Sequence, residues 1–245
     1  MTPFHALSLA MLKGFARDRI TLLFTFLFPM MFVVAFGLLH SDANQADALL
    51  RMVPMLSWAV AGTGVFGMGM TVVSWRRRGL LRRIRLAPVT VPAVLLSRLA
   101  TNLLVTLAQT AAFLGVVLLP VFGVRLGDRW WLSVPVILLG ASAFSALGLL
   151  VGAVCRSEEA ASALANFLVM PMALLSGTFF DLDQAPSWLR QTARLLPLHH
   201  LDTALLDTLT SRHSVTALLQ PSTALAGFTA VTAALALRLF RWDNE

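Results

Sequence analysis

Six arginines lie within residues 76–85, in the stretch WRRRGLLRRIRLAP that runs from Trp75 to Pro88 between two long apolar segments. At the centre of a bilayer each arginine costs about 2.5–3.5 kcal/mol, and a neighbouring leucine returns only about 0.5 kcal/mol. The stretch must therefore lie outside the hydrocarbon. Because cytoplasmic loops carry the excess of Lys and Arg, we expect it on the cytoplasmic side, and its position sets the orientation of the segments around it.

The apolar content indicates the class of protein in which this stretch lies. Of 245 residues, 58% are hydrophobic and 13% are charged, which is typical of a chain that crosses the membrane several times. Several spans leave no room for a large soluble domain, so we expect one transmembrane domain over residues 1–245. The lone cysteine, Cys155, excludes an intramolecular disulfide and a multi-cysteine metal site, and no metal is expected.

Apolar length and periodicity predict an all-α integral membrane protein with six spans. An amphipathic interfacial helix over residues 2–19 precedes them, and two short external helices, interfacial or re-entrant, are expected within 181–213. A further cytoplasmic helix over 76–87 is expected between the second and third spans. The six spans are expected at 20–39, 52–74, 97–122, 132–154, 162–180 and 221–240.

The charge distribution supports this topology. With both termini in the cytoplasm, thirteen basic and five acidic residues fall on the cytoplasmic side, Arg98 among the basic ones, whereas six basic and seven acidic residues fall outside. The net charge of +7 is therefore a cytoplasmic excess, as the positive-inside rule requires. This distribution favours membrane lipids over nucleic acid as the partner of the positive charge.

The chain resembles the membrane subunits of type-2 ABC exporters in three places. The first is FARDRITLLFTFLFP, an amphipathic leader that runs into a span with a central proline. The second is RRRGLLRRIRLAPVT, similar to the basic-glycine-leucine segment that ends in Pro-Val between spans two and three of the family. The third is LSGTFFDLDQAPSWLRQTARLLPLHHL, which resembles the family's stretch from span five through a Pro-x-Trp-Leu helix to a Leu-Pro-Leu turn. One departure is that Arg77 and Arg78 precede Gly79, where family members often have an acidic residue.

The resemblance implies how the work of transport is divided. Family members pair as homodimers or heterodimers in the bacterial cytoplasmic membrane and dock two separate ATPase subunits, which bind ATP and magnesium. This chain would then hold no cofactor and would form, with a second permease subunit, the pathway for a lipid-like, drug-like or glycan substrate. The sequence is consistent with a separate ATPase, because a P-loop needs a lysine after its glycine-rich turn and the only lysine, Lys13, has no such turn around it. We therefore expect a transport subunit rather than an ATPase.

The arginine stretch has two interpretations. It can be a topology signal that binds anionic lipid, at about 1 kcal/mol per basic residue. It can also be a coupling helix seated in a groove of the ATPase subunit, as the resemblance implies, and we expect both. The coupling residues predicted in this way are Arg78, Gly79, Leu80, Leu81, Arg82 and Ile84, with Glu158 and Glu159 as a second contact for which a solvated turn is an equally good reading.

The substrate pathway is predicted from the resemblance alone, because spans two and five of the two family protomers face each other across it. Methionine and phenylalanine form adaptable apolar walls that suit a lipid-like or drug-like cargo. Ordinary helix packing is the alternative for each residue, and Asn166 is the best single candidate because an intramembrane amide usually needs a partner. The predicted residues are Thr63, Phe66, Met70, Asn166, Phe167 and Met170.

Two functions from other classes were weighed. A membrane enzyme could use an external set of possible zinc ligands, although His200 and Asp202, two residues apart, do not share a helical face. The full set is His199, His200, Asp202, Asp207 and His213. A passive channel is also possible, but the spans lack the ring of charge that an ion pore needs.

Overall fold

The computed structural model describes residues 3–39, 45–79, 90–179, 185–211 and 215–239, and this part of the chain is helical and contains no strand. The all-α prediction is therefore confirmed for the described residues. The helices, with the short 3-10 and π segments marked η, are α1 (Pro3–Arg17), α2 (Arg19–Leu22), η1 (Leu23–Leu27), α3 (Phe28–Leu39), α4 (Gln45–Arg77), α6 (Val91–Val117), η2 (Pro120–Phe122), η3 (Trp130–Leu132), α7 (Ser133–Val154), α8 (Glu158–Leu175), α9 (Ser187–Ala193), α10 (Pro197–Thr210), η5 (Val215–Leu218) and α11 (Leu219–Leu239).

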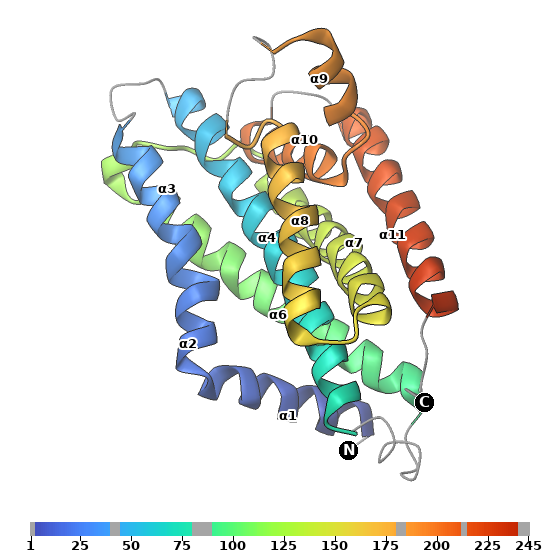
Figure 1. Cartoon of the computed structure of the whole chain (residues 1–245). Coiled ribbons are helices and arrows are strands. Elements are labelled where there is room, and N and C mark those ends of the chain that lie inside the picture. The colour runs from blue at the N-terminus through green and yellow to red at the C-terminus, as the bar shows by residue number, and fades with distance from the viewer. Residues whose placement is uncertain (1–2, 40–44, 80–89, 180–184, 212–214, 240–245) are drawn as a thin grey trace.

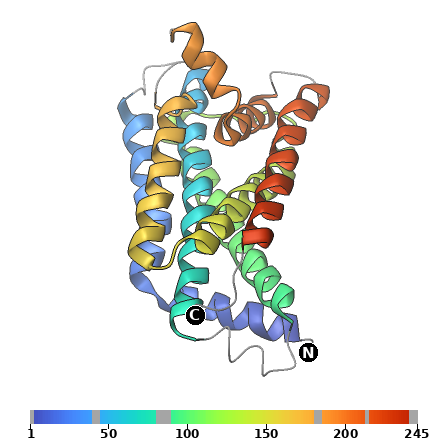
Figure 2. The same cartoon turned by 45° about the vertical axis from the view of Figure 1, so that its right-hand side comes forward.

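The long helices form a bundle with two distinct ends. Figures 1 and 2 show α1 lying across one end, whereas α9 and α10 lie at the opposite end. We call the first the α1 end. The chain direction alternates, so that the end of α4, the start of α6 and the turn between α7 and α8 all lie at the α1 end (Figure 1). The segments that were expected in the cytoplasm therefore share one end of the molecule.

Five described helices are long and apolar enough to cross a membrane, or six if one bent pair is counted as a span. The bent pair joins Leu7–Arg17 to Arg19–Ala35 at 81°, and it contains most of the expected first span. The bend lies at Asp18, whose carboxylate caps α2 by accepting bonds from the Thr21 amide at 3.1 Å and hydroxyl at 2.5 Å. The five others are Leu49–Arg77, Pro92–Val117, Trp130–Val154, Glu158–Leu175 and Thr216–Leu239.

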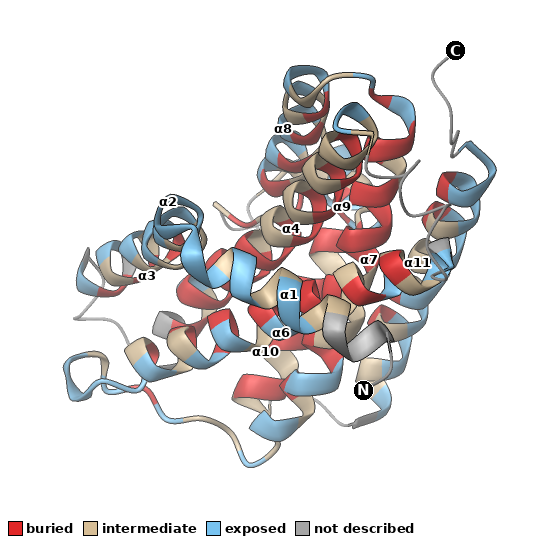
Figure 3. Ribbon diagram, turned by 90° about the horizontal axis from the view of Figure 1, so that it is seen from below, coloured by how far each residue is buried: buried red, intermediate tan, exposed pale blue. Residues whose placement is uncertain are grey.

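Helices α4 and α7 form the centre of the bundle. In the most apolar stretch of each helix, 61% of α4 and 67% of α7 is buried inside the protein, compared with 22% of α8 and 17% of α11. Figure 3 shows the buried residues gathered on α4 and α7 and the exposed residues on the outward faces of α2, α8 and α11. Glycine allows the close approach, because a Cβ at Gly148 would lie 2.6 Å from the Val65 carbonyl oxygen and 2.8 Å from that of Gly64.

Of the two alternatives expected for the short helices, interfacial or re-entrant, α10 does not match the interfacial one. Its leucine stripe is fully buried, because α4, α7 and α11 cover it at the end of the bundle away from α1. The stripe therefore packs on protein rather than on lipid headgroups. Helix α9 lies at the surface of the bundle, where Trp188 is exposed. The buried leucines are Leu198, Leu201, Leu205 and Leu209.

Candidate functional site

Arg76 fastens the end of α4 to the end of α7. Its Nη2 donates to the carbonyl oxygens of Gly152 and Cys155, the latter at 2.8 Å. Both carbonyls belong to the last turn of α7 and its C-cap, where helices leave C=O groups without an intrahelical partner. Arg76 therefore acts as a side-chain cap, and with Arg77 it belongs to the last turn of α4 rather than to a separate helix starting at residue 76.

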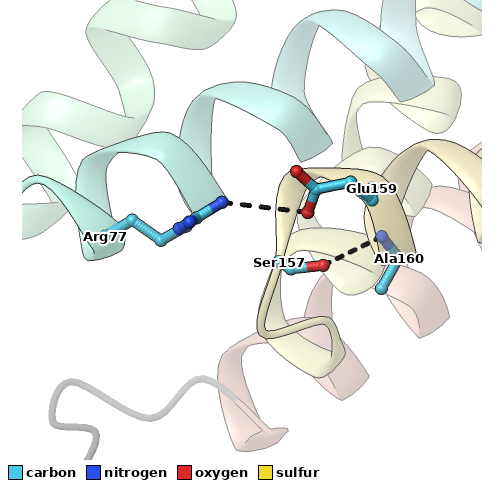
Figure 4. Close-up of polar contacts among 4 residues, drawn as sticks. All are labelled: Arg77, Ser157, Glu159 and Ala160. Atoms are coloured by element: carbon cyan, nitrogen blue, oxygen red, sulfur yellow. Dashed lines mark hydrogen bonds and ion pairs between the residues drawn. The ribbon is translucent and has the colours of Figure 1, made fainter.

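The ion pair between Arg77 and Glu159 connects α4 with α8. Arg77 Nη1 lies 3.8 Å from Glu159 Oε2, and both side chains are largely exposed (Figure 4). Ser157 caps α8 because its Oγ accepts a bond from the Ala160 amide at 3.1 Å. An exposed pair of this kind contributes only about 0–1 kcal/mol, so the turn is positioned mainly by its cap and by Arg76.

The two predicted coupling contacts meet at the α1 end. Arg78 and Gly79 follow α4 directly, and Glu158 and Glu159 open α8 beside it. Gly79 has φ +65°, the left-handed conformation in which glycine commonly ends a helix. Leu80, Leu81, Arg82 and Ile84 lie outside the described residues, as does the rest of the predicted coupling helix after Gly79.

A groove of about 1030 Å³ opens between α2, η1 and α3 on one side and α4, α6 and α8 on the other. Of the predicted pathway residues, Phe167 is not part of its lining and is 73% exposed. Asn166 reaches the groove, but its amide donates to the Ser162 carbonyl of its own helix at 3.0 Å, so it needs no partner from another span. The predicted residues that line the groove are Thr63, Phe66, Met70, Asn166 and Met170.

Helix α6 contributes a polar face that the sequence analysis did not single out. Arg98, Asn102 and Gln109 are spaced by four and seven residues and turn toward α4. Arg98 was counted among the cytoplasmic basic residues, but it lies within α6 and its Nε and Nη2 donate to the Gly67 carbonyl at 3.2 and 2.7 Å. The helical spacing of these polar residues within an apolar span was the available signal.

The other two residues of this face are buried and bonded. Asn102 Nδ2 donates to the Thr63 carbonyl at 3.2 Å and to Ser145 Oγ at 3.1 Å. Gln109 accepts a bond from Thr63 Oγ1 at 3.1 Å and donates to the Thr25 carbonyl at 2.9 Å. Thr25 belongs to the π segment η1, a type of irregularity that often marks functional sites. The α6 face therefore holds the first bent helix against α4 beside the groove.

The His and Asp residues that were weighed as zinc ligands do not form a common site within the described part of the chain. In the described part of the chain, no three His, Cys, Asp or Glu side chains come together as metal ligands would, and His213 lies outside that part. His200 Nε2 bonds to the Arg194 carbonyl at 2.9 Å. Asp202 is buried in α10, where its Oδ2 accepts a bond from Thr178 Oγ1 at 3.3 Å, and burial raises its pKa to about 8.

A helical bundle with five or six candidate spans, and with a groove along its side, defines a multi-pass membrane protein. Residues 2–210 match the family model of the ABC-2 type transporter. The chain therefore belongs to this family of membrane permease subunits. It is the transport subunit and lacks the ATPase domain, and nucleotide binding in this family lies in separate ATPase subunits with which the permeases pair.

Curated relatives agree with the family. The putative transport permease YvfS of Bacillus subtilis is 26% identical over 203 residues, which cover 79% of this chain and 80% of that protein. The probable doxorubicin resistance ABC transporter permease protein DrrC of Mycobacterium tuberculosis is 30% identical over 135 residues, 52% of this chain and 49% of its own length. Nodulation protein J of Rhizobium leguminosarum bv. trifolii is 36% identical over 97 residues, 38% of this chain and 37% of that protein. The matched part is thus about half of DrrC and less of nodulation protein J.

Proposed function

We propose that this chain, paired with a second permease subunit, forms the pathway of an ATP-driven exporter for amphipathic organic molecules. The groove between the first bent helix (α2, η1 and α3) and helices α4, α6 and α8 is the observation that carries the proposal. Its volume of about 1030 Å³ lies at the upper end of the range for ligand sites. Its aromatic and methionine walls suit a lipid-like or drug-like cargo. The name of DrrC refers to doxorubicin resistance, which supports a drug-like cargo.

The exposed apolar face of α8 is the observation that supports a second permease subunit in the proposal. Phe167, Met170 and Leu174 are 46–73% exposed at the open side of the groove. A second subunit against this face would enclose the groove between two chains, because Met170 belongs both to the face and to the groove lining. Whether that subunit is identical to this chain is decided by the mass of the purified complex.

The α1 end supports a docking role for the ATPase subunit. Arg78, Gly79, Glu158 and Glu159 gather there from two helices, and the remaining predicted coupling residues follow Gly79 in the sequence. The arginine excess of this end favours the cytoplasm by the positive-inside rule. In this orientation both chain termini are cytoplasmic, the segment with α9 and α10 is external, and the membrane is the bacterial cytoplasmic membrane.

Reconstitution with the motor tests the proposal. The chain is co-expressed with a candidate ATPase subunit, and the purified complex is placed in vesicles with the ATPase outside. We expect ATP hydrolysis and ATP-dependent uptake of amphipathic dyes or lipids, and neither with a hydrolysis-deficient ATPase subunit. The chain alone should hydrolyse no ATP. ATP-independent flux equal to that with ATP would instead identify a passive channel and overturn the proposal.

A further inference from the structure

The groove contains a cation that no carboxylate neutralises within the described residues. Both bonds recorded for the Arg98 guanidinium go to the Gly67 carbonyl, which carries no net charge. Among the side chains that the structure describes, no ion pair joins Arg98 to an Asp or Glu. A guanidinium has five N–H donors, so it can accommodate an additional acceptor. The positive charge remains without a counter-charge from these parts of the protein.

The position of this charge is costly for a residue with no function. Gly67 lies ten residues before the end of α4 at Arg77, which places its carbonyl about 15 Å along the helix axis from that end. Gly67 and Arg98 both lie within candidate spans, Leu49–Arg77 and Pro92–Val117, so the guanidinium lies between two apolar helices rather than beyond their ends. Ionisable residues at such depth usually face a cavity or pathway and pair with a group of opposite charge.

The other groups that line the groove indicate what can supply that charge. Among the described residues of the lining, Asp18 is the only acidic one, and it is exposed at the bend, where it caps α2. The lining also contains the aromatic side chains of Phe28, Trp58 and Phe66, and the neutral polar side chains in it, Thr63, Asn102 and Gln109, are bonded within the protein. A molecule that fits this distribution has a compact anionic head and an apolar body.

Thr71 allows Arg98 to leave the Gly67 carbonyl and bind a ligand instead. Its Oγ1 also donates to the Gly67 carbonyl, at 2.6 Å. If Arg98 turns toward a ligand, this carbonyl keeps a hydrogen bond, so no buried acceptor is left unsatisfied. Arg98 and Thr71 both belong to the groove lining.

We propose that the groove binds a cargo molecule with an anionic head group, which pairs with Arg98, while its apolar body packs along Phe28, Trp58 and Phe66. The proposal rests on the proposed function, which makes the groove part of the cargo pathway, and adds the charge of the cargo. An ionic hydrogen bond in a water-poor groove is among the stronger contacts that a protein can offer. Arg98 is thus a specificity-determining residue for anionic amphiphiles.

Photo-crosslinking tests this without any transport measurement. The permease is placed in nanodiscs of phosphatidylcholine with a diazirine-bearing alkyl sulfonate, which stays charged at all working pH values, or with the alcohol of the same chain. Mass spectrometry then locates the crosslinks. We expect the sulfonate to label groove residues about tenfold more than the alcohol does, as one charge-assisted bond implies. Equal labelling by the two probes in the wild-type protein would overturn the proposal, whatever the variants do.

Variants separate charge from structure. Arg98→Gln keeps a donor for the Gly67 carbonyl but removes the charge, and should lower sulfonate labelling to the level of the alcohol. Arg98→Lys should retain most of it. Arg238→Gln is the matched control, because Arg238 is exposed on α11 and lies outside the groove lining, and it should change nothing. Undiminished labelling in Arg98→Gln would refute the role of Arg98.

A membrane phospholipid is the competing source of the anion. Replacing about a third of the phosphatidylcholine by phosphatidylglycerol should leave sulfonate labelling in place. Its disappearance would show that the groove holds bilayer lipid, and would overturn the assignment to cargo. Failure of this binding with intact ATP-driven uptake of neutral amphiphiles would contradict the charge preference alone, whereas intact binding without ATP-driven uptake would contradict the exporter function.

Discussion

Nη2 of Arg76 lies 2.8 Å from the carbonyl oxygen of Cys155, and this bond ties the last turn of α4 to the end of α7. The arginine stretch is therefore not one uniform patch. Arg76 is partly buried and serves the fold, whereas Arg77 and Arg78 are exposed beside the turn that opens α8. Arg76 therefore connects the end of α4, next to the proposed docking surface, to the end of α7 at the centre of the bundle.

Removing the Arg76 side chain should destabilise the protein more than removing that of Arg77. Arg76→Ala leaves the terminal carbonyls of α7 without their donor, at a cost of about 1.5–3 kcal/mol for hydrogen bonds to a charged group. Arg77→Ala removes only an exposed pair, which contributes about 0–1 kcal/mol. Thermal unfolding in detergent compares the two variants. Equal midpoints would show that Arg76 is not a structural cap.

Helix α4 can approach α7 only because Gly148 has no side chain. In Gly148→Ala the new methyl group would lie 2.6 Å from the Val65 carbonyl oxygen, a backbone atom that cannot turn aside, so the helices must separate and the unfolding temperature should fall. Gly227→Ala is the control, because the position is helical in α11 and nothing lies within 4 Å of its Cβ. That change should be neutral or stabilising by up to about 1 kcal/mol. A fall of the same size in both variants would contradict the packing argument.

The sequence predicted six spans, and the described helices include five candidates, or six if the bent pair is counted, because hydropathy and length decide which segments can cross a bilayer. It was not sufficient for pairings between distant segments. A short helix was expected in the segment of α10, but helical periodicity cannot say whether lipid or protein covers its apolar face, and α4, α7 and α11 cover it. Arg98, near the start of the expected third span, was counted among the cytoplasmic basic residues. Its actual acceptor, the Gly67 carbonyl, comes from a helix that only the fold brings near.

Asp202 should make the stability of the protein depend on pH. The helix α10 lies outside the candidate spans, and burial raises the pKa of Asp202 to about 8 from its ordinary 3.8. Between these values the folded state binds a proton that the unfolded chain has lost, so this residue lowers stability as pH rises from about 4 to about 8. Above that range its effect is constant.

Thermal unfolding of the wild-type protein and Asp202→Asn at pH 5–9 measures this effect. The asparagine is neutral at every pH, so the unfolding temperature of the variant should rise relative to that of the wild type as pH rises. The difference should level off above pH 8. The pKa of His199 is lowered chiefly by burial, so this residue destabilises the protein in acid. The effect is the same in the wild type and the variant, and it cancels in the difference. A difference that does not change with pH would show that Asp202 is ionised in the folded protein.

The two ends of the bundle should be distinguishable from outside the cell. In a Cys155→Ser background, we expect a membrane-impermeant maleimide to label Ser187→Cys at the start of α9 but not Arg78→Cys beyond α4. Both native side chains are exposed, so the comparison reports sidedness rather than access within the fold. Permeabilised cells should show labelling at both positions. Labelling of Arg78→Cys in intact cells would reverse the proposed topology.

The segment after Gly79 should couple the permease to its ATPase subunit through apolar contacts. Leu81 and Ile84 lie outside the described residues, and the sequence places them three apart, on one face of the predicted coupling helix. The double variant Leu81→Asp with Ile84→Asp adds charge outside the bilayer, so insertion of the spans is unaffected. The same charge would lose its water in a docking groove. We expect loss of ATPase co-purification and of ATP-driven uptake in vesicles, with an unchanged unfolding temperature of the isolated permease.

The matched control removes charge at the neighbouring positions. Arg82→Gln with Arg83→Gln should weaken association only modestly, and mainly at low salt, because rim charges tune encounter more than affinity. Normal assembly and transport in the Leu81/Ile84 double variant, together with failure of the Arg82/Arg83 double variant, would identify the stretch as an electrostatic anchor. The docking would then depend on the arginines that follow Arg76, and the apolar face of the predicted helix would have no part in it.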